Sequence, residues 1–577
     1  MHRHLYILII FVFVLTVADV RAQDQTPTPI LNGIQTNAPE NLKDVPVIAA
    51  DYRSDDRSLP DLGRVGVDMT QQRTLTLPEA LELALNNNLD IEVSRKTFTM
   101  AEFDLRAARG FYQPRLTGQS YYDRSTVPNV SIFSNNQKTT QGNLLGNAAL
   151  TAYAPKFGTV FTGSFNNQRL TTDNPISILS PQLNSSLGFA VTQPLFRGRR
   201  FDQTRRTIEI AKRNISLTDT QFRQRSIEVV SGVQRAYWDL TFALRNLQVQ
   251  RDAIRDAKAQ LEHNRRLVDE GQLAPIDIVA AETQVANFDQ AVYDALNVVN
   301  QAENVLKNLI APNRTDAIWG QALTPVEPVE VSVPNPTLTE AMDTAVDNRP
   351  ELEINKTQKD INSLDQRLYR DQKKPQIDFV ASYSSAGIGG GRNPNFSPTI
   401  PTACTRVPPD PVGCAQLQAN LALLTGNPFS GIIANRYPVF RVGINFNLPL
   451  FGDKTAAAQL GRSRFEAERL DTQREQIEQG IQVEVRNALQ AIRTGEARLR
   501  SAAIARENTA KQYESEQRKL DSGQSDVYKV LERQTALATA RSNELRARTE
   551  LNKAIADLQR ATGNSLKANN IEPKLKK

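Results

Sequence analysis

A short stretch that occurs twice decides the fold of this chain. Residues 77–87 read LPEALELALNN, and residues 338–348, 261 positions later, read LTEAMDTAVDN. Three more landmarks recur in the same order in both copies: Gln113-Pro114-Arg115-Leu116 with Lys374-Pro375-Gln376-Ile377, Gln193-Pro194-Leu195-Phe196 with Leu448-Pro449-Leu450-Phe451, and Gly271-Gln272 with Gly523-Gln524. This repeated order predicts that the 577 residues build two copies of one structural unit.

Each copy opens with a predicted amphipathic helix. The first runs from about Leu77 to Phe111 and the second from about Leu338 to Lys373, because apolar residues recur there at helical spacing. Proline disfavours the helical conformation in the residue before it. We therefore expect Pro114 and Pro375 to stop these helices.

Alternating segments follow each of these helices. In the second copy, Val442, Ile444 and Phe446 alternate with small or polar residues, and residues 187–192 have the same period in the first copy. A strand of a membrane-embedded barrel has this pattern, and so does a half-buried strand of a soluble sheet, so the pattern alone leaves both open. Further strand candidates are Gln119 to Arg124, Thr159 to Asn167 and Ile377 to Ser384. The strand count of the first copy stays open, with room for an additional hairpin.

Long helices are predicted after Pro194 and Pro449, the two strand-to-helix transitions. No proline occurs between Pro194 and Pro275, or between Pro449 and Pro573. At about 1.5 Å per residue, a helix from Gly452 to about Leu520 spans on the order of 100 Å. Its apolar residues form only a narrow stripe, so it must lie along neighbouring helices as in a coiled coil. The stripe contains Ile477, Ile481, Val485, Leu489 and Ile492.

Two glycines mark the far ends of the long helices. Gly271 and Gly523 are expected to form tight turns, since glycine commonly terminates helices. Antiparallel return helices are then predicted from Pro275 to Ile310 and from about Asp526 to Thr562.

The first 22 residues are predicted to be a signal peptide. Arg3 precedes a short apolar run, and we expect cleavage after Ala22; a short membrane anchor is the alternative. No other long apolar stretch occurs, so a membrane-spanning role would require a β-barrel. The net charge of +6 is spread along the chain without a dense basic block, which disfavours a nucleic-acid partner.

Few residues could carry catalytic or metal chemistry. His2 and His4 leave with the signal peptide, and His263 lies among polar neighbours, where a solvated position is expected. Cys404 and Cys414 are the only cysteines, and in an exported chain they favour a disulfide; their spacing disfavours a CxxC metal or redox pair. We predict no catalytic residues, no metal site and no cofactor.

The chain resembles the TolC family of outer-membrane efflux proteins from about Leu75 to Gly563. The resemblance rests on the order of the duplicated motifs, above all residues 193–196 and 448–451 and the two tips GQLAPIDI (271–278) and GQSDVYKVLE (523–532). It implies a mainly α fold with a transmembrane β-barrel, in which a duplicated helix–strand–long-helix unit forms a trimeric α-barrel/β-barrel channel-tunnel. Together with the residues outside the resemblance, we predict the division 1–22 signal peptide, 23–72 irregular extension, 73–330 first repeat, 331–564 second repeat and 565–577 basic tail.

The resemblance also implies function and partners. The chain would be one protomer of a homotrimer in the outer membrane of a Gram-negative-type bacterium, in contact with outer-membrane lipid and with a long periplasmic portion. It would act as the passive exit duct of a tripartite efflux or type I secretion system, and not as an enzyme. A periplasmic adaptor would dock on the tips, and an inner-membrane transporter of the RND, ABC or a similar class would supply the energy.

The hairpin tips are the candidate site. The resemblance assigns the periplasmic gate to Asp277, Asp526, Lys529 and Glu532, and adaptor docking to Gly271, Gln272, Leu273, Gly523, Gln524 and Ser525. Lys529 and Glu532 match positions that are acidic in the family, so Lys529 reverses one charge, and we predict a Lys529–Glu532 clasp between protomers. Asp277 matches a closing position whose family partners are an aromatic residue and an arginine. Leu520 and Ser525 hold those places here, so the closing contacts must differ.

Two other classes of protein remain as alternatives. A trimeric coiled-coil adhesin or structural surface protein would also combine an export signal, helices and a barrel, but would lack the duplication. A secreted hydrolase could use the abundant Asp and Glu, yet no compact site pattern occurs. The stretch from Ser385 to Tyr437, with its Gly387–Gly391 run, is expected to be a flexible loop that faces the cell exterior rather than a phosphate-binding loop.

Overall fold

The computed structural model describes residues 63–129, 137–326, 333–397, 402–408, 410–450 and 452–572, which belong to one compact unit beginning at Gly63. The predicted signal peptide, residues 23–62 of the predicted extension, and the terminal Lys574, Lys576 and Lys577 lie outside the described residues.

The first repeat contains four strands of the main sheet and four α-helices. In chain order its elements are β1 (Asp68–Leu75), α1 (Leu77–Asn87), α2 (Leu89–Arg109), the 3-10 helix η2 (Gly110–Tyr112), β2 (Arg115–Pro128), β3 (Lys138–Tyr153), β4 (Val160–Thr172), β5 (Leu179–Pro194), α3 (Gln203–Asp269) and α4 (Pro275–Ile310). The additional hairpin that the sequence left open is therefore present in this copy.

The second repeat follows the same plan with two strands of the main sheet. The remaining elements, of which η3 and β6 precede residue 331 and α11 follows residue 564, are η3 (Ala317–Gly320), β6 (Gln321–Pro325), α5 (Leu338–Asn348), α6 (Pro350–Gln372), β7 (Gln376–Arg392), α7 (Pro411–Leu424), α8 (Pro428–Ile433), β8 (Tyr437–Asn447), α9 (Lys454–Asp521), α10 (Val527–Ala561) and α11 (Ser565–Ala568). The duplication extends to side chains: the Thr76 and Thr337 hydroxyls cap α1 and α5 in the same way.

The prediction of one continuous first helix in each copy is wrong. In the first copy, Asn88 has an extended backbone and its side-chain oxygen accepts a hydrogen bond from the Asp90 N–H (2.9 Å), which starts a new helix. In the second copy, Arg349 precedes Pro350 and is extended, as a residue before proline prefers to be.

The long helices are confirmed. The α3 helix has 67 residues and α9 has 68, which corresponds to about 100 Å at about 1.5 Å per residue. Ile481, Val485, Leu489 and Ile492 of α9 are buried and form a core with α10 and α5, as the apolar stripe predicted.

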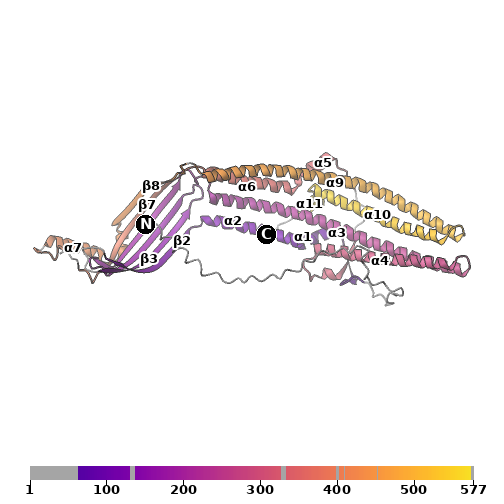
Figure 1. Cartoon of the computed structure of the whole chain (residues 1–577), viewed down its shortest axis with the longest axis horizontal. Coiled ribbons are helices and arrows are strands. Elements are labelled where there is room, and N and C mark those ends of the chain that lie inside the picture. Colours follow the sequence, from indigo (N-terminus) through magenta and orange to yellow (C-terminus); the bar gives the residue numbers. More distant parts are fainter. Residues whose placement is uncertain are drawn as a thin grey trace, which may run out of the picture. The chain divides into compact units, whose positions relative to one another are not determined.

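The helices lie side by side in a consistent order (Figure 1). Near the sheet the order is α2, α3, α6, α9, and toward the hairpin tips it is α4, α3, α10, α9. Within this set, α2 packs on α3 and leaves its other side open, and α9 is the outermost helix at the opposite side. Among the described residues, no helix combines the length and the apolar character that crossing a membrane requires.

The main sheet has six antiparallel strands in the order β2-β3-β4-β5-β7-β8, so β2 and β8 are its edges. One row of directly paired residues across all six strands reads Leu116, Leu150, Gly163, Phe189, Tyr383 and Phe440. The next row reads Thr117, Ala149, Ser164, Gly188, Ser384 and Val439. Since successive side chains point to opposite faces, the sheet has one apolar face, which carries the first row, and one face of mostly small and polar side chains.

Two segments at the predicted boundaries contain regular structure that the sequence did not predict. The predicted extension ends in a strand, because residues 68–75 form β1, which pairs in parallel with β6 and buries Leu75. The predicted basic tail begins with α11, whose Leu566 is buried in the core of the first repeat. In both places, apolar residues that are isolated in the sequence find a core contributed by distant segments.

The described residues of the predicted loop from Ser385 to Tyr437 contain regular secondary structure. The Gly387–Gly391 run belongs to β7, and α7 and α8 lie between β7 and β8. A Cβ atom on Gly387 would run into the carbonyl oxygen of Pro428 at the start of α8. Glycine is therefore required here for close backbone packing rather than for loop flexibility.

Candidate gating tip and helix groove

The two hairpin tips have the same backbone geometry. Gly271 and Gly523 adopt φ angles of +74° and +73°, a conformation that glycine adopts without strain. The next residue in each tip donates its N–H to a carbonyl five positions earlier, Gln272 to Leu267 and Gln524 to Lys519, both at 2.8 Å. These are Schellman-type helix ends, so the tip glycines serve the turn itself.

Aspartates begin both return helices. The Asp277 carboxylate accepts a hydrogen bond from the Ala274 N–H (3.1 Å), and the Asp526 carboxylate accepts one from the Lys529 N–H (2.9 Å). This backbone hydrogen bond, together with the Lys529 side chain, lowers the pKa of Asp526. The structure therefore gives Asp277 and Asp526, two of the three acidic gate candidates, a helix-capping role.

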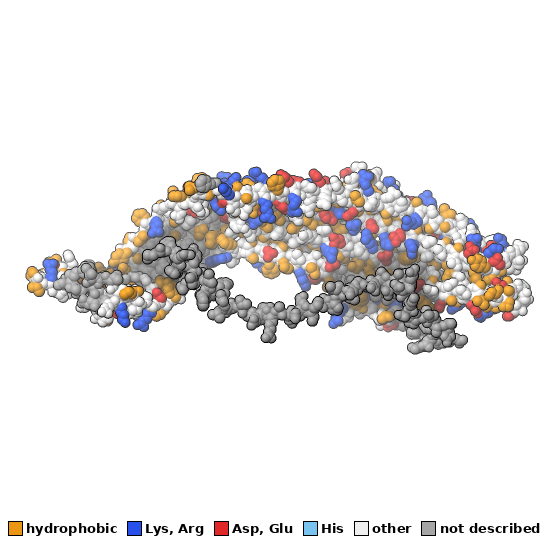
Figure 2. Space-filling model, in the orientation of Figure 1, with side chains coloured by type: hydrophobic (Ala, Val, Ile, Leu, Met, Phe, Trp, Pro, Cys, Tyr) orange, Lys and Arg blue, Asp and Glu red, His pale blue; other side chains and the backbone are white. Residues whose placement is uncertain are grey.

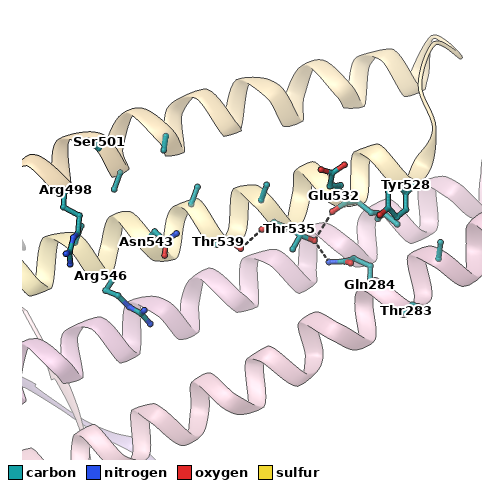
Figure 3. A pocket seen from close by; sticks show the side chains of 17 residues that line it. Thr283, Gln284, Arg498, Ser501, Tyr528, Glu532, Thr535, Thr539, Asn543 and Arg546 are labelled. Carbon is teal, nitrogen blue, oxygen red and sulfur yellow. Dashed lines mark hydrogen bonds between the residues drawn. The ribbon is translucent and has the colours of Figure 1, made fainter.

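Lys529 pairs within its own turn. Its Nζ lies 3.1 Å from the Asp526 carboxylate, and both side chains are more than half exposed. Glu532 lies one turn further along α10, where it lines the groove shown in Figure 3. The Lys529–Glu532 clasp concerns two protomers and stays a prediction.

The two tips are joined to each other. Leu520 and three residues of α10, Val527, Val530 and Leu531, form a buried cluster against which Leu273 of the first tip packs. The family-like docking candidate Leu273 is thus partly a core residue. Leu520, which stands where the family has an aromatic closing partner, is 5% exposed and contributes to the same cluster.

Sequence reasoning missed several polar contacts at the tip. The His263 imidazole of α3 lies 3.1 Å from the Asp521 carboxylate at the end of α9, so it is not simply solvated. Ser525 donates a hydrogen bond to Glu516, which lowers the pKa of Glu516. Both contacts join residues that lie near each other only after the hairpins form, and only the polarity of these positions hinted at them.

A groove runs beside the tips along one face of α10 (Figure 3). It has a volume of about 1080 Å³, and α4 and α9 form its two walls. The floor consists of α10 residues at intervals of three or four, which places them on one helical face: Tyr528, Glu532, Thr535, Thr539, Asn543 and Arg546. The Gln284 amide of α4 donates to the Thr535 hydroxyl (2.9 Å), so that wall is held in place. Many lining residues are Ala, Ser or Thr, and small side chains allow another helix to approach closely.

A buried charged cluster lies far from the tips. The Glu303 carboxylate of α4 accepts hydrogen bonds from the Arg64 guanidinium (3.0 Å) and the Leu323 N–H of β6 (2.7 Å). Lys307 lies one turn further along α4, with its Nζ 3.7 Å from Glu303, and donates to the Trp319 carbonyl oxygen (3.0 Å). The side chains of Glu303 and Lys307 are fully buried, and burial lowers the pKa of Lys307.

The remaining site predictions fall at the sheet. Pro194 is the last residue of β5 and Pro449 follows β8, and the long helices begin nine and five residues after them. Cys404 and Cys414 form a disulfide. Cys404 precedes α7, and Cys414 lies in the first turn of this helix. Among the described residues, no group of three or more His, Cys, Asp or Glu side chains is arranged to hold a metal ion.

Comparison with known proteins places this geometry in a family. The family described as "Outer membrane efflux protein" matches residues 147–311 and 342–564, one segment in each repeat and together more than half of the chain. No curated protein sequence matched the chain closely.

Solved structures share the fold at low sequence identity. The outer-membrane channel OprN has a TM-score of 0.59 at 14% identity, with 89% of this chain and 98% of that chain covered. The CmeC outer-membrane channel of Campylobacter jejuni has a TM-score of 0.57 at 15% identity, covering 85% and 86%. The open state of the MtrE outer-membrane channel of Neisseria gonorrhoeae has a TM-score of 0.57 at 14% identity, covering 85% and 89%.

The match of a single family to both repeats does not favour the adhesin alternative. The chain belongs to the outer membrane efflux protein family, and it is an export duct of the outer membrane.

Proposed function

We propose that three copies of this chain form one continuous duct, with a shared sheet in the outer membrane and a tube of helices in the periplasm. The duct is passive: a periplasmic adaptor docks at the hairpin tips, and an inner-membrane transporter supplies the energy. It performs no chemical step and needs no cofactor.

The open edges of one protomer support assembly. Strands β2 and β8 each have one unpaired side in a single chain, and an unsatisfied backbone group costs several kcal/mol in lipid. Because β2 and β8 are different strands, each copy can offer one to the previous protomer and one to the next. The result is a ring in which no edge remains open.

The outer helices carry exposed apolar side chains. Along α2, the side of the helix away from α3 exposes Leu89, Val93, Met100 and Phe103 to solvent, with Val93 63% and Phe103 57% exposed. Along α9, at the opposite side of the helical layer, Phe465 is 73% exposed. On a helical segment that lies in water, a group of exposed apolar side chains indicates a contact surface for another protein. A second copy that places its α9 beside α2 would cover both.

The tip groove supports the docking of a helical partner. Its floor of small and polar side chains at helical intervals suits an incoming helix, and its position beside both tips suits an adaptor that reaches the open end of the tube. Lys529 and Glu532 of three copies would then surround the entrance.

The assembly is tested by electron microscopy of the detergent-extracted protein. A threefold particle with a hollow axis is expected, whereas a solid rod or a compact monomer would overturn the proposal. Phe103→Asp should lower the trimer fraction, because a charge at a buried interface is costly.

The gate is tested separately by single-channel conductance. In Lys529→Asp, positions 529 and 532 would both be acidic in all three protomers. The negative charge around the entrance would then be larger, and the channel should prefer cations more strongly. Unchanged ion selectivity in this variant would refute the assignment of Lys529 to the entrance.

A further inference from the structure

The segment between β7 and β8 contains an unusually long stretch without charge. From Pro411 to Asn435 the sequence has no Asp, Glu, Lys or Arg, although such residues make up 23% of the whole chain. Charges flank the stretch on both sides: Arg406 and Asp410 form an ion pair before it, and Arg436 follows it. The stretch contains α7, which is labelled in Figure 1, and α8.

The second helix of this insertion packs on the apolar face of the sheet. The ring of Phe429 stacks on Phe165 of β4, with 6.0 Å between the ring centroids. The Tyr383 hydroxyl donates to Asn435 (2.7 Å), and the Ser385 hydroxyl donates to the Ile432 carbonyl oxygen (3.0 Å). The strand register places Phe165, Tyr383 and Ser385 on one face, which is the face that also carries Phe189 and Phe440.

The insertion leaves its own apolar side chains uncovered. No residue of α7 is buried, and Val412 on this helix is 68% exposed. On α8, Ile433 is 86% exposed. Figure 2 shows hydrophobic side chains over the sheet near β8, whereas Lys, Arg, Asp and Glu are spread over the long helices. Because α8 packs on the apolar face of the sheet, its exposed Ile433 lies beside that face.

We propose that residues 411–435 form a lipid-embedded collar, in which α8 covers the outer face of the sheet and both helices bury their apolar side chains among acyl chains of the outer leaflet. The proposal rests on the membrane placement of the sheet in the proposed function. The apolar face is the one that meets lipid, because the opposite face carries the polar side chains that a water-filled duct needs. The insertion lies next to this lipid-facing side of the sheet and has 25 residues without charge. Lipid is therefore the environment that suits it.

The flanking groups suit this placement. The Cys404–Cys414 disulfide ties the start of α7 to the segment that carries Arg406, so the uncharged helix begins next to an ion pair. Arg436 directly precedes β8. Charged residues at the boundaries of an apolar segment are expected where it leaves the acyl region for the headgroups.

Quenching by brominated lipid tests the collar in the full chain. The two native tryptophans, Trp238 and Trp319, lie in α3 and η3 and provide a constant background. Ile433→Trp and Val412→Trp place a new indole at exposed positions of α8 and α7. Two matched variants on β8 calibrate the signal: Phe446→Trp on the apolar face and Asn445→Trp on the polar face.

The variants are reconstituted in phosphatidylcholine vesicles with and without brominated acyl chains. The added emission of Ile433→Trp and Val412→Trp should fall by roughly half or more, as for Phe446→Trp, because interfacial helices sit about 5–10 Å deep, within reach of the bromines. Asn445→Trp should be unaffected.

Other outcomes overturn the collar. If Ile433→Trp behaves as Asn445→Trp does, the insertion lies in water. If its emission is blue-shifted but unquenched, a second copy or another protein covers it. If Phe446→Trp is itself unquenched, the membrane placement of the sheet fails, and the collar fails with it.

Discussion

Removal of the buried Glu303 carboxylate should loosen the junction between the first repeat and β6. In Glu303→Leu, Arg64 and Lys307 stay in place without the carboxylate that neutralises them, and the Leu323 N–H loses its acceptor. Breaking a buried ion pair from one side costs about 3–5 kcal/mol. Since about 1.4 kcal/mol corresponds to a tenfold change in an equilibrium constant, opening of β6 should become about a hundredfold to a few thousandfold more frequent.

Hydrogen exchange measured by mass spectrometry on peptides that contain residues 321–325 is the direct assay. A matched control is available on the same helix: Glu282 pairs with Arg265 at the same 3.0 Å, but both side chains are about half exposed. Glu282→Leu should change the exchange of α4 by less than about 1 kcal/mol, because exposed ion pairs contribute little.

A second variant separates charge from packing. Glu303→Leu/Lys307→Met removes one of the stranded cations and should recover a large part of the lost protection, since paired removal of buried charges is often close to neutral. The reasoning is refuted if Glu303→Leu exchanges β6 at the wild-type rate, or if the double variant is no better protected than the single one.

Three further predictions concern the tips and the insertion. Gly523→Ala should destabilise the second tip by about 1 kcal/mol through its positive φ alone, because no atom lies within 4 Å of the added Cβ; faster exchange confined to the tip peptide would show it. Acid should weaken the cap of α10: Asp526 has a lowered pKa in the folded protein, so its contribution is present above the ordinary pKa of 3.8 and is lost as the pH falls through the folded value. Asp526→Asn keeps a cap without a titrating group, and its tip exchange, corrected for intrinsic rates, should show no such step as the pH falls below 3.8. Gly387→Leu should displace α8 from the sheet, because the side chain would occupy the place of the Pro428 carbonyl; unchanged protease resistance of residues 411–435 would contradict this.

Periodicity predicted the parts of the fold that depend on local pattern. The bounds of α4 agree with the predicted Pro275 to Ile310, and those of α9 and α10 agree within a few residues, because proline, glycine and apolar spacing mark them directly. The break at Asn88 was missed because an asparagine within an apolar period gives no strong stop signal. Pro350 did mark the second break, yet the apolar spacing on both sides concealed it.

Contacts between distant segments could not be predicted from pattern. Nothing in residues 68–75 indicates pairing with β6, and nothing near Arg64 indicates a carboxylate on α4. At the tip, the sequence located the positions that correspond to the gate of the family, but it did not predict which side chains these residues contact. Lys529 lies beside Asp526 in its own helix, and Leu520 is part of a core. The collar was mistaken for a loop because its glycines and prolines are typical of loops until the strand that they pack on is known.

The sheet can be completed only late in folding, because a strand of the first repeat pairs with a strand of the second. Strand β5 pairs with β7, so residues such as Leu187 and Ser385 must meet across nearly two hundred intervening positions. Closing a loop of that length costs about 5 kcal/mol of chain entropy beyond the constant term, which only the completed pairing repays. Until β7 arrives, the four strands of the first repeat have an unpaired edge and an uncovered apolar face, which are the features that drive aggregation. While its second half is still being exported, the first half of the chain therefore has to be protected from aggregation. A chaperone or rapid delivery to the membrane would provide this protection.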